Sequence, residues 1–267
     1  MKQRFIRRRP EEKNALAAAR TRCGLARAIS KRGYCSRSQA VDLIGAGRVA
    51  LNGRIVRDPE KPVHSEKDCI EIDGAVVNEQ AKVYLVMNKP RGLVTTASDE
   101  QGRRTVYDLL APEIPWVGPV GRLDKASEGL LLLTNDSQWS ARITDPASHL
   151  DKRYHVQVDC LPDETLLRRI LRGTPVAGEH LRVKSARVLR LGVKNFWLEI
   201  VLDEGRNRHI RRLLDAVGVH VLRLLRVAIG PLELGDLGKG TVRLLTSMEK
   251  NALDQALTAR ASQAHRF

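Results

Sequence analysis

Residues 121–134 read GRLDKASEGLLLLT, a stretch that indicates a buried strand with an unusual polar residue at its entrance. The run Leu130–Leu133 has the apolar character of a fully buried strand. Asp124 stands between Gly121 and Gly129, although aspartate is poor in strands and glycine weakens a strand unless the backbone bends or a ligand approaches closely. The pattern therefore predicts a carboxylate on a rigid platform, between glycines that leave room for a ligand.

Two interpretations of Asp124 are open at this point. In the first, Asp124 is a turn carboxylate paired with Arg122 or Lys125. In the second, it is a reactive group presented to a ligand. Taken alone, the stretch favours the first interpretation, because most matches to a short motif arise by chance. The rest of the chain has to decide between them.

The chain is strongly basic, and its positive charge is concentrated near one end. It has 267 residues and a formal net charge of +15. Residues 1–37 hold twelve Lys or Arg against two acids, Glu11 and Glu12. Nucleic-acid phosphates are the expected partner of such a cluster, since binding releases counterions. An anionic membrane surface is the alternative partner.

Several protein classes are disfavoured by the same sequence. No run of about eighteen apolar residues is present, so no membrane-spanning helix is expected. The basic N-terminus lacks the apolar stretch of a secretory signal. The cysteines at 23, 35, 69 and 160 have neither metal-ligand nor disulfide-framework spacing, so we expect free thiols in a cytoplasmic protein. With no glycine loop for phosphates and no His/Cys cluster, neither a cofactor nor a metal is expected.

Residues 22–80 are predicted to form a small α+β module behind a basic tail at 1–21. Apolar residues between Leu25 and Ile44 indicate two short helices, the second capped by Ser36 or Ser38. An Asn-Gly pair at 52–53 and an Asp-Gly pair at 73–74 each separate two short apolar segments. Such pairs favour two-residue hairpin turns, which need positive φ at both central positions. The module is too small for an elaborate active site, so binding is its expected task.

The helices of this module carry cations that would share a face if the helices pack as a hairpin. These cations are Arg27, Lys31, Arg32, Arg37 and Arg48. The arrangement resembles the S-four (S4) domain, an RNA-binding module named after a small-subunit ribosomal protein. The resemblance implies that these five side chains bind RNA.

A second domain is predicted over residues 82–250, with a C-terminal tail at 251–267. Strands are expected at 83–87, 154–158, 185–191 and 196–202, and helices at 138–143, 163–172 and 207–217. The last helix would carry Arg208, Arg211 and Arg212 as neighbours three and four residues apart. Because strands dominate and βαβ alternation is missing, we expect an α+β fold with a mixed, largely antiparallel sheet and flanking helices.

Four motifs occur in order in this second domain. They are Asn88-Lys89-Pro90-Arg91-Gly92, the stretch from Gly121 through Leu131, Lys152-Arg153-Tyr154, and residues 204–212, which read EGRNRHIRR. With the N-terminal module they resemble the pseudouridine synthases of the ribosomal small-subunit pseudouridine synthase A type, over residues 22–248. The resemblance implies a cofactor-free enzyme that breaks the glycosidic bond of a uridine in ribosomal RNA, turns the uracil and rejoins it through carbon. A non-catalytic RNA-binding assembly factor on the same fold is the alternative.

The resemblance also implies roles for single residues. Asp124 would be the nucleophile or base, acting on either the ribose or the uracil ring. Arg122 would extrude the uridine and fill its place in the RNA. Tyr154 would lie against the flipped uracil, with a core tyrosine as the alternative. Arg211, or Arg212 if the helix phase differs by one residue, would be the cation that keeps Asp124 ionised.

The remaining expectations concern the partner. Lys89, Arg91, Arg208 and Arg212 would contact RNA, although Lys89 and Arg91 could equally be solvated turn residues. His209 stands where relatives often have glutamine, and its role is RNA-facing or structural. The partner would be ribosomal RNA or an assembly intermediate, of the large rather than the small subunit by the character of residues 204–208, bound by a monomer with no membrane contact.

Overall fold

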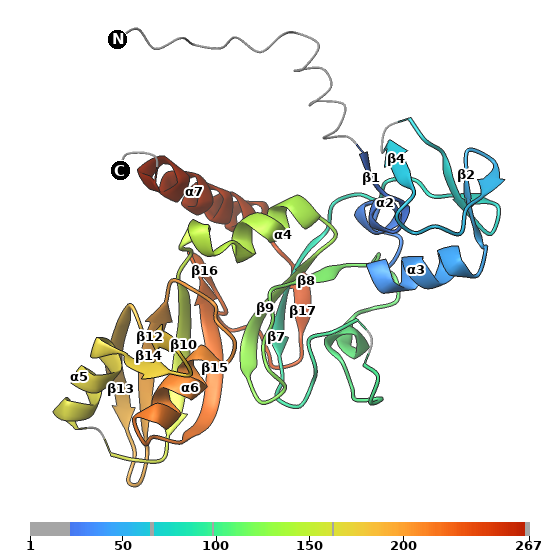
Figure 1. Cartoon of the computed structure of the whole chain (residues 1–267). Coiled ribbons are helices and arrows are strands. Elements are labelled where there is room, and N and C mark those ends of the chain that lie inside the picture. The colour runs from blue at the N-terminus through green and yellow to red at the C-terminus, as the bar shows by residue number, and fades with distance from the viewer. Residues whose placement is uncertain (1–21, 65–66, 98, 162, 265–267) are drawn as a thin grey trace, which may run out of the picture. The chain divides into compact units, whose positions relative to one another are not determined.

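The computed structural model describes residues 22–64, 67–97, 99–161 and 163–264 (Figure 1). These residues fall into two compact units, one of residues up to 82 with 115–117 and the other of 83–114 with the residues from 118 onward. The predicted basic tail at 1–21 lies outside the described residues. Within the described part of the chain, no helix has the length and apolar character needed to cross a bilayer.

The N-terminal unit consists of two short helices and two small sheets. Its elements are β1 (Arg22–Gly24), α2 (Leu25–Lys31), α3 (Arg37–Gly45), β2 (Val49–Leu51), β3 (Arg54–Ile55), β4 (Pro62–His64), β5 (Ile70–Ile72) and β6 (Ala75–Val76). One sheet has the order β3-β2-β5-β6, and β1 pairs with β4 in the other. Buried apolar residues of both helices and of the strands, among them Leu25, Ile29, Ile44 and Ile70, form one core.

Local chemistry explains where these elements begin and turn. The Ser36 side chain accepts a hydrogen bond from the Gln39 amide, and the Gln39 side chain accepts one from the Ser36 amide, which confirms the predicted cap as a capping box. Asn52 and Gly53 have φ values of 52° and 76°, and Asp73 and Gly74 have 51° and 79°. Both predicted hairpin turns are therefore confirmed.

The second unit is built on one large mixed sheet. Its strands are β7 (Tyr84–Lys89), β8 (Gly118–Val120), β9 (Glu128–Thr134), β10 (Lys152–Val158), β13 (Ser185–Leu191), β14 (Phe196–Leu202), β15 (Val221–Ile229), β16 (Leu232–Glu233) and β17 (Val242–Leu244). The main order is β13-β14-β10-β15-β9-β7-β17, with β8 on β9 and β16 on β15. Among these strands β9 and β15 pair in parallel and the others pair antiparallel. The predicted mixed, largely antiparallel sheet is confirmed.

Helices and two separate cores complete this unit. The helices are α4 (Ser137–Thr144), α5 (Glu164–Arg172), α6 (His209–Ala216) and α7 (Ser247–Ala264), and β11 (Thr174–Val176) pairs with β12 (Glu179–Leu181). One core joins β10, β14 and β15 to α5 and α6, and the other joins β7 and β9 to α4 and α7. The C-terminal tail expected at 251–267 is corrected over residues 251–264: they belong to α7, because Leu253 and Leu257 are buried in the second core.

Candidate active site

The largest set of predicted site residues meets at one cavity of about 720 Å³. Its walls come from the loop before β9, the start of β10, the segment 204–210 and the middle of β15. Asp124, Arg122, Tyr154 and Arg208 all line it. Asp124 and Arg122 also line a second hollow of about 490 Å³, which residues of the segment 94–103 border. Chain segments far apart in sequence therefore converge on Asp124.

The backbone around Asp124 is held by hydrogen bonds at every carbonyl from 123 to 127. The donors to these five carbonyls are, in chain order, Thr95 Oγ1 at 2.7 Å, Lys89 Nζ at 3.1 Å, the Gly92 amide at 2.7 Å, Arg211 Nη2 at 3.1 Å, and Lys89 Nζ again at 2.9 Å. Fixed donors of this kind leave a loop one arrangement, which is how reactive side chains are preorganised. The platform predicted for Asp124 is thus a loop anchored from β7, the segment after it, and α6.

Lys89 is part of this anchor and is fully buried. Its ammonium donates to three backbone carbonyls, those of Pro90, Asp124 and Ser127, which uses all three of its N–H groups. Burial lowers the pKa of Lys89 to about 8, while Asp124 and Glu128 act in the opposite direction. The structure corrects the prediction that Lys89 contacts RNA, because its side chain points into the protein and has no free donor.

Asp124 itself is half-buried and keeps its carboxylate free of the protein. Within the described residues its carboxylate oxygens make no hydrogen bond and no ion pair, in particular none with Arg122 or Lys125. The interpretation of Asp124 as a turn carboxylate paired with a neighbour therefore does not describe this structure. A fixed backbone and an unengaged carboxylate facing a cavity are the two properties of a group presented to a ligand.

The two candidate arginines of α6 point to different places. Arg211 donates to the Ala126 carbonyl at 3.1 Å and to the Val221 carbonyl at 3.4 Å. Burial lowers the pKa of Arg211, and Asp124 is the carboxylate that opposes this shift. Arg212 instead pairs with Glu179 of β12 at 2.9 Å. Arg211, rather than Arg212, is therefore the cation whose charge acts on Asp124, although it is not in a direct ion pair with it.

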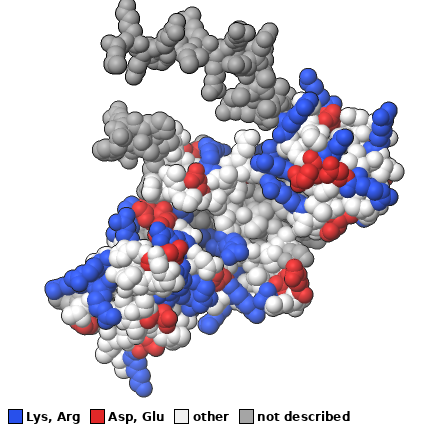
Figure 2. Space-filling model, in the orientation of Figure 1, with Lys and Arg blue, Asp and Glu red and all other residues white. Residues whose placement is uncertain are grey.

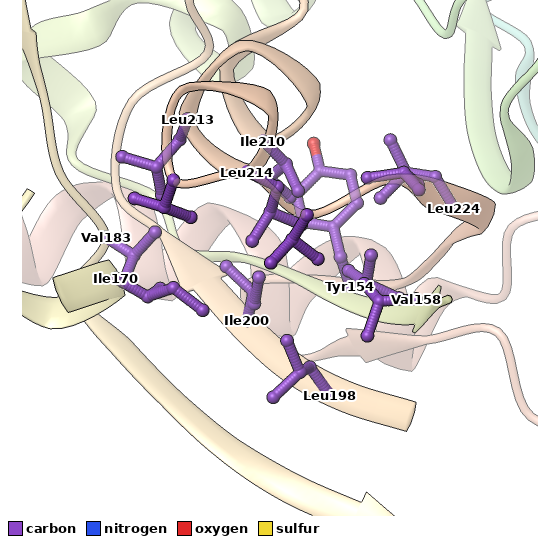
Figure 3. Packing of buried hydrophobic residues seen from close by; sticks show 14 of the residues in the cluster. Tyr154, Val158, Ile170, Val183, Leu198, Ile200, Ile210, Leu213, Leu214 and Leu224 are labelled. Atoms are coloured by element: carbon purple, nitrogen blue, oxygen red, sulfur yellow. The ribbon is translucent and has the colours of Figure 1, made fainter. Parts of the chain in front are cut away.

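Tyr154 lies on the face of β10 that packs against α6. Its ring stands between Ile210 and Leu224, with the hydroxyl oxygen at the end away from Leu198 and Ile200 (Figure 3). The residue is 9 % exposed and lines the cavity, so its ring is packed in the core while one end remains accessible. Core packing and contact with a ligand are thus compatible for this side chain.

His209 and two arginines leave polar atoms unsatisfied at this cavity. Among the described residues, the buried side-chain nitrogens without a hydrogen-bond partner are both ring nitrogens of His209, Nε of Arg211 and Nη2 of Arg226. His209 and Arg226 line the cavity, and Arg211 contacts the Asp124 loop. Burial lowers the pKa of His209, against the pull of Glu204, whose carboxylate lies 3.6 Å from its Nδ1. Buried groups in folded proteins are rarely left unpaired, so this concentration marks a place for a polar ligand.

Two of the predicted cations, Arg122 and Arg208, line the cavity, and a third, Arg91, lies close enough for its charge to act on Arg211. Arg91, Arg122 and Arg208 are exposed and make no ion pair or side-chain hydrogen bond within the part of the chain that is described. Arg208 precedes α6 with a φ of 48°, so it is not on the helix with Arg211 as predicted. These side chains form the rim of the site.

Gly121 and Gly129, the glycines on either side of Asp124, are required for different structural reasons. Gly121 has a φ of 75° and lines the cavity. Gly129 has a φ of 102°, and a Cβ there would lie 2.3 Å from the Arg226 carbonyl oxygen. The interpretation that both glycines leave room for a ligand is corrected for Gly129, because β15 already fills the space beside it.

In the N-terminal unit, the five predicted RNA-binding cations separate into two groups. Arg32 donates to the carbonyls of Val77 and Asp68, and Arg48 pairs with Asp73. Arg27, Lys31 and Arg37 have no such partner among the described residues. Figure 2 shows basic side chains spread over the visible face of this unit with acidic ones among them. Arg32 therefore stabilises the fold, and Arg48 is partly neutralised.

Two residues at the site were not predicted from the sequence: Thr95, which anchors the Asp124 loop, and Arg226, which lines the cavity. Arg226 offered one signal, a lone charge within the apolar run Leu224–Ile229. Thr95 offered none, since its bond to Leu123 spans 28 residues. In the described part of the chain, no group of three or more His, Cys, Asp or Glu could hold a metal ion. The arrangement offers instead a free carboxylate, a phenol and several cations, which suit nucleophilic or acid–base chemistry on an anionic substrate.

Known proteins match both units of the chain. Residues 83–216 match the RNA pseudouridylate synthase family and residues 23–69 match the S4 domain. An uncharacterized RNA pseudouridine synthase of Aquifex aeolicus is 39 % identical over 86 % of this chain and 92 % of its own length. Ribosomal large subunit pseudouridine synthase B of Bacillus subtilis is 35 % identical over 86 % of this chain and 94 % of its own.

A solved structure agrees with these sequence matches. A crystal structure of a pseudouridylate synthase superposes with a TM-score of 0.61 and 31 % identity, covering 86 % of this chain and 99 % of that one. The predicted resemblance is therefore confirmed, in the N-terminal module as well as in the domain that carries Asp124. The chain belongs to the RNA pseudouridine synthase family, with an N-terminal S4 domain.

Proposed function

We propose that this enzyme converts one or more uridines of ribosomal RNA to pseudouridine, in the large rather than the small subunit. The similarity to the Bacillus subtilis protein named for the large subunit supports this choice of substrate. The net charge of +15 and the S4 domain fit a substrate rich in phosphate. We extend the proposal to a monomer that acts in the cytoplasm.

The observation that carries the proposal is the contrast within the Asp124 loop. Every carbonyl from 123 to 127 has a donor, whereas the Asp124 carboxylate has no partner among the described residues and lines the cavity. In the proposed mechanism this carboxylate is the nucleophile or base that acts on a uridine flipped out of the RNA. Both the ribose and the uracil ring are open as its target.

The other residues support this step. Arg122 is exposed at the mouth, where its guanidinium can take the place of the extruded base. Tyr154 offers the accessible end of its ring, against which the uracil lies. Arg211 holds the loop through the Ala126 carbonyl and places a partly buried positive charge close enough to interact with the Asp124 carboxylate. Within the described part of the chain, no partner is found for the side chains of Arg91, Arg208 and, in the S4 domain, Arg27, Lys31 and Arg37, which can therefore meet RNA phosphates.

The test is the Asp124→Asn variant in a single-turnover assay on ribosomal RNA transcripts, with pseudouridine mapped by base. We expect isomerisation to fall by several powers of ten, because the amide is neither nucleophile nor base, while RNA affinity stays near that of the wild type. Asp108→Asn is the matched control, since Asp108 lies outside the cavity and pairs with Arg104. Substantial activity in the Asp124→Asn enzyme would refute the assigned role.

Two further measurements test the substrate. Pseudouridine maps of ribosomal RNA from cells that lack this gene should lose a signal in the large subunit. A loss confined to the small subunit would contradict the choice of subunit. If the wild-type enzyme bound ribosomal RNA tightly and formed no pseudouridine in any transcript or assembly intermediate, the protein would instead be a non-catalytic RNA-binding factor.

A further inference from the structure

Arg226 is a buried cation on the floor of the cavity. It lies on β15 directly opposite Tyr154 of β10, so the two side chains share the face of the sheet that the cavity occupies. A register shift between Arg153 and Tyr154 separates the Tyr154–Arg226 pair from the adjacent pair, Arg153 and Ala228. Arg226 is 5 % exposed, whereas the rim cations are exposed. Its guanidinium therefore lies beneath the mouth of the site, at the level of the tyrosine.

The bonding of Arg226 is incomplete in a way that the fold does not explain. Its Nε donates to the Leu130 carbonyl at 2.8 Å, while Nη2 is buried with no partner, and no carboxylate of the described residues pairs with it. Three residues earlier, Arg223 donates to both carboxylate oxygens of Glu128 at 3.1 Å. An unpaired buried guanidinium is costly, so a protein that keeps one usually has a ligand for it.

The chemistry of the proposed reaction supplies such a ligand, and this inference rests on that proposed function. When the bond between C1′ and N1 breaks, its electron pair stays on the uracil and is shared by N1 and the two carbonyl oxygens. C5 of the turned ring then bonds to C1′ and afterwards loses its proton, while N1 takes up a proton, so the atoms and electrons balance without an oxidant or reductant. Negative charge therefore develops transiently on the uracil oxygens, and a fixed cationic donor there would lower the barrier.

We infer that Arg226 is a catalytic residue that donates a hydrogen bond from its guanidinium to a carbonyl oxygen of the target uracil. A uracil against Tyr154 brings its edge to the neighbouring cross-strand position, which Arg226 occupies. A phosphate is the poorer occupant of this position. The sugar–phosphate backbone stays at the mouth, where Arg122 and Arg208 are exposed, and burying its charge would require desolvation.

The first experiment compares Arg226→Met with Arg223→Met, the same substitution on the same strand but outside the cavity lining. Single-turnover rates are measured at saturating RNA, together with RNA affinity and the thermal midpoint. We expect Arg226→Met to lose about 10²- to 10³-fold in rate with nearly unchanged affinity, the loss typical for removal of one oxyanion donor. Arg223→Met should keep the wild-type rate. A folded Arg226→Met enzyme with the wild-type rate would overturn the inference.

A second experiment separates catalysis from a merely structural role. The target position of the RNA is replaced by 2-thiouridine or 4-thiouridine. Each analogue exchanges one uracil carbonyl oxygen for sulfur, which is a weaker hydrogen-bond acceptor. In the wild type one of the two analogues should react more slowly than uridine, and in Arg226→Met that penalty should vanish, since the contact is already gone. Equal penalties in both enzymes would overturn the inference.

A fallback variant and a separate measurement distinguish a failure of the role of Arg226 from a failure of the proposed function. If Arg226→Met does not fold, Arg226→Lys keeps the buried charge but not the guanidinium geometry, so its analogue penalty should differ from that of the wild type, and an identical penalty and rate would overturn the inference. The wild-type rate on unmodified RNA tests the proposed function independently. An active wild type with an unaffected Arg226→Met variant would therefore refute the role of Arg226 alone.

Discussion

The cations inside the site and the cations on its rim are bonded in opposite ways. Lys89, Arg211 and Arg226 are buried to different degrees and direct N–H groups at backbone carbonyls of the loop before β9 or of β9 itself. Arg91, Arg122 and Arg208 are exposed and have no such bond among the described residues. Residues of one charge type thus serve two purposes at one site.

The difference predicts which measurement each group affects. An inner cation holds a backbone atom in a low-dielectric setting, so its loss should change stability and the rate of the chemical step. A rim cation meets solvent and phosphate, so its loss should change RNA affinity and the dependence of affinity on salt.

The largest effect is expected for Lys89→Met. The substitution removes the ammonium that donates to three carbonyls, of which, among the described residues, only the Asp124 carbonyl keeps another donor, the Ser127 amide, so we expect the free energy of unfolding to fall by about 3 kcal/mol. The Asp124 loop would lose two of its anchors, and the single-turnover rate should fall more than tenfold in the folded enzyme. Urea unfolding and single-turnover kinetics measure the two effects.

Lys194→Met is the control for this substitution. Lys194 is exposed in the turn between β13 and β14, so its replacement should change neither stability nor rate. If Lys89→Met instead weakened RNA binding at an unchanged rate and stability, Lys89 would belong with the rim. The division between inner and rim cations would then be broken.

A smaller loss is expected for Thr95→Val, which removes one hydroxyl at nearly constant shape. The Thr95 hydroxyl donates to the Leu123 carbonyl at 2.7 Å, and no other donor to that carbonyl is found among the described residues. We expect a loss of about 1.5 kcal/mol in the free energy of unfolding and a measurable fall in rate. Thr95→Ser, which keeps the hydroxyl, should restore both. Failure of Thr95→Ser to restore the rate would mean that packing, not the hydrogen bond, holds Leu123.

The sequence could predict the elements because their signals are local. The run Leu130–Leu133 indicated a buried strand, and all four residues are fully buried in β9. The Asn-Gly and Asp-Gly pairs specified their turns through the backbone angles that they permit. The helix α7 was missed because its polar residues conceal two inward positions, Leu253 and Leu257.

The bonding of the site could not be predicted, because it depends on contacts between distant parts of the chain. Lys89 stood in a turn motif that indicated exposure, yet one of its acceptors, Ser127, is 38 residues away. The acceptor of Arg226 is 96 residues away. Sequence motifs named Asp124, Tyr154 and Arg211 as site residues. The division of the cations into anchors and rim required the sheet that brings β7, β9 and β15 together.

Substitution of a rim cation should change RNA affinity but not the rate of the chemical step. The Arg91→Gln variant tests this expectation. Loss of one phosphate contact should weaken RNA binding severalfold at low salt and reduce the slope of log Kd against log salt by about 0.7–0.9. At saturating RNA the single-turnover rate should be unchanged. Arg104→Gln, an exposed arginine already paired with Asp108, should leave the salt slope as in the wild type. A fall in rate at saturation would place Arg91 with the inner cations.

The smallest effect is expected for His209, a buried residue at the cavity, and it concerns the dependence of stability on pH. Because burial lowers its pKa, the folded state favours the neutral imidazole, while the unfolded chain takes up a proton near pH 6.5. The contribution to stability is therefore complete above that pH and is lost as the pH falls through the lower pKa of the folded state. His209→Gln cannot titrate, so the stability of this variant, measured by urea unfolding, should decrease less between pH 7 and pH 5 than that of the wild type. Equal decreases in the two proteins would show that folding does not change the pKa of His209, and His209 would then not belong with the buried inner residues.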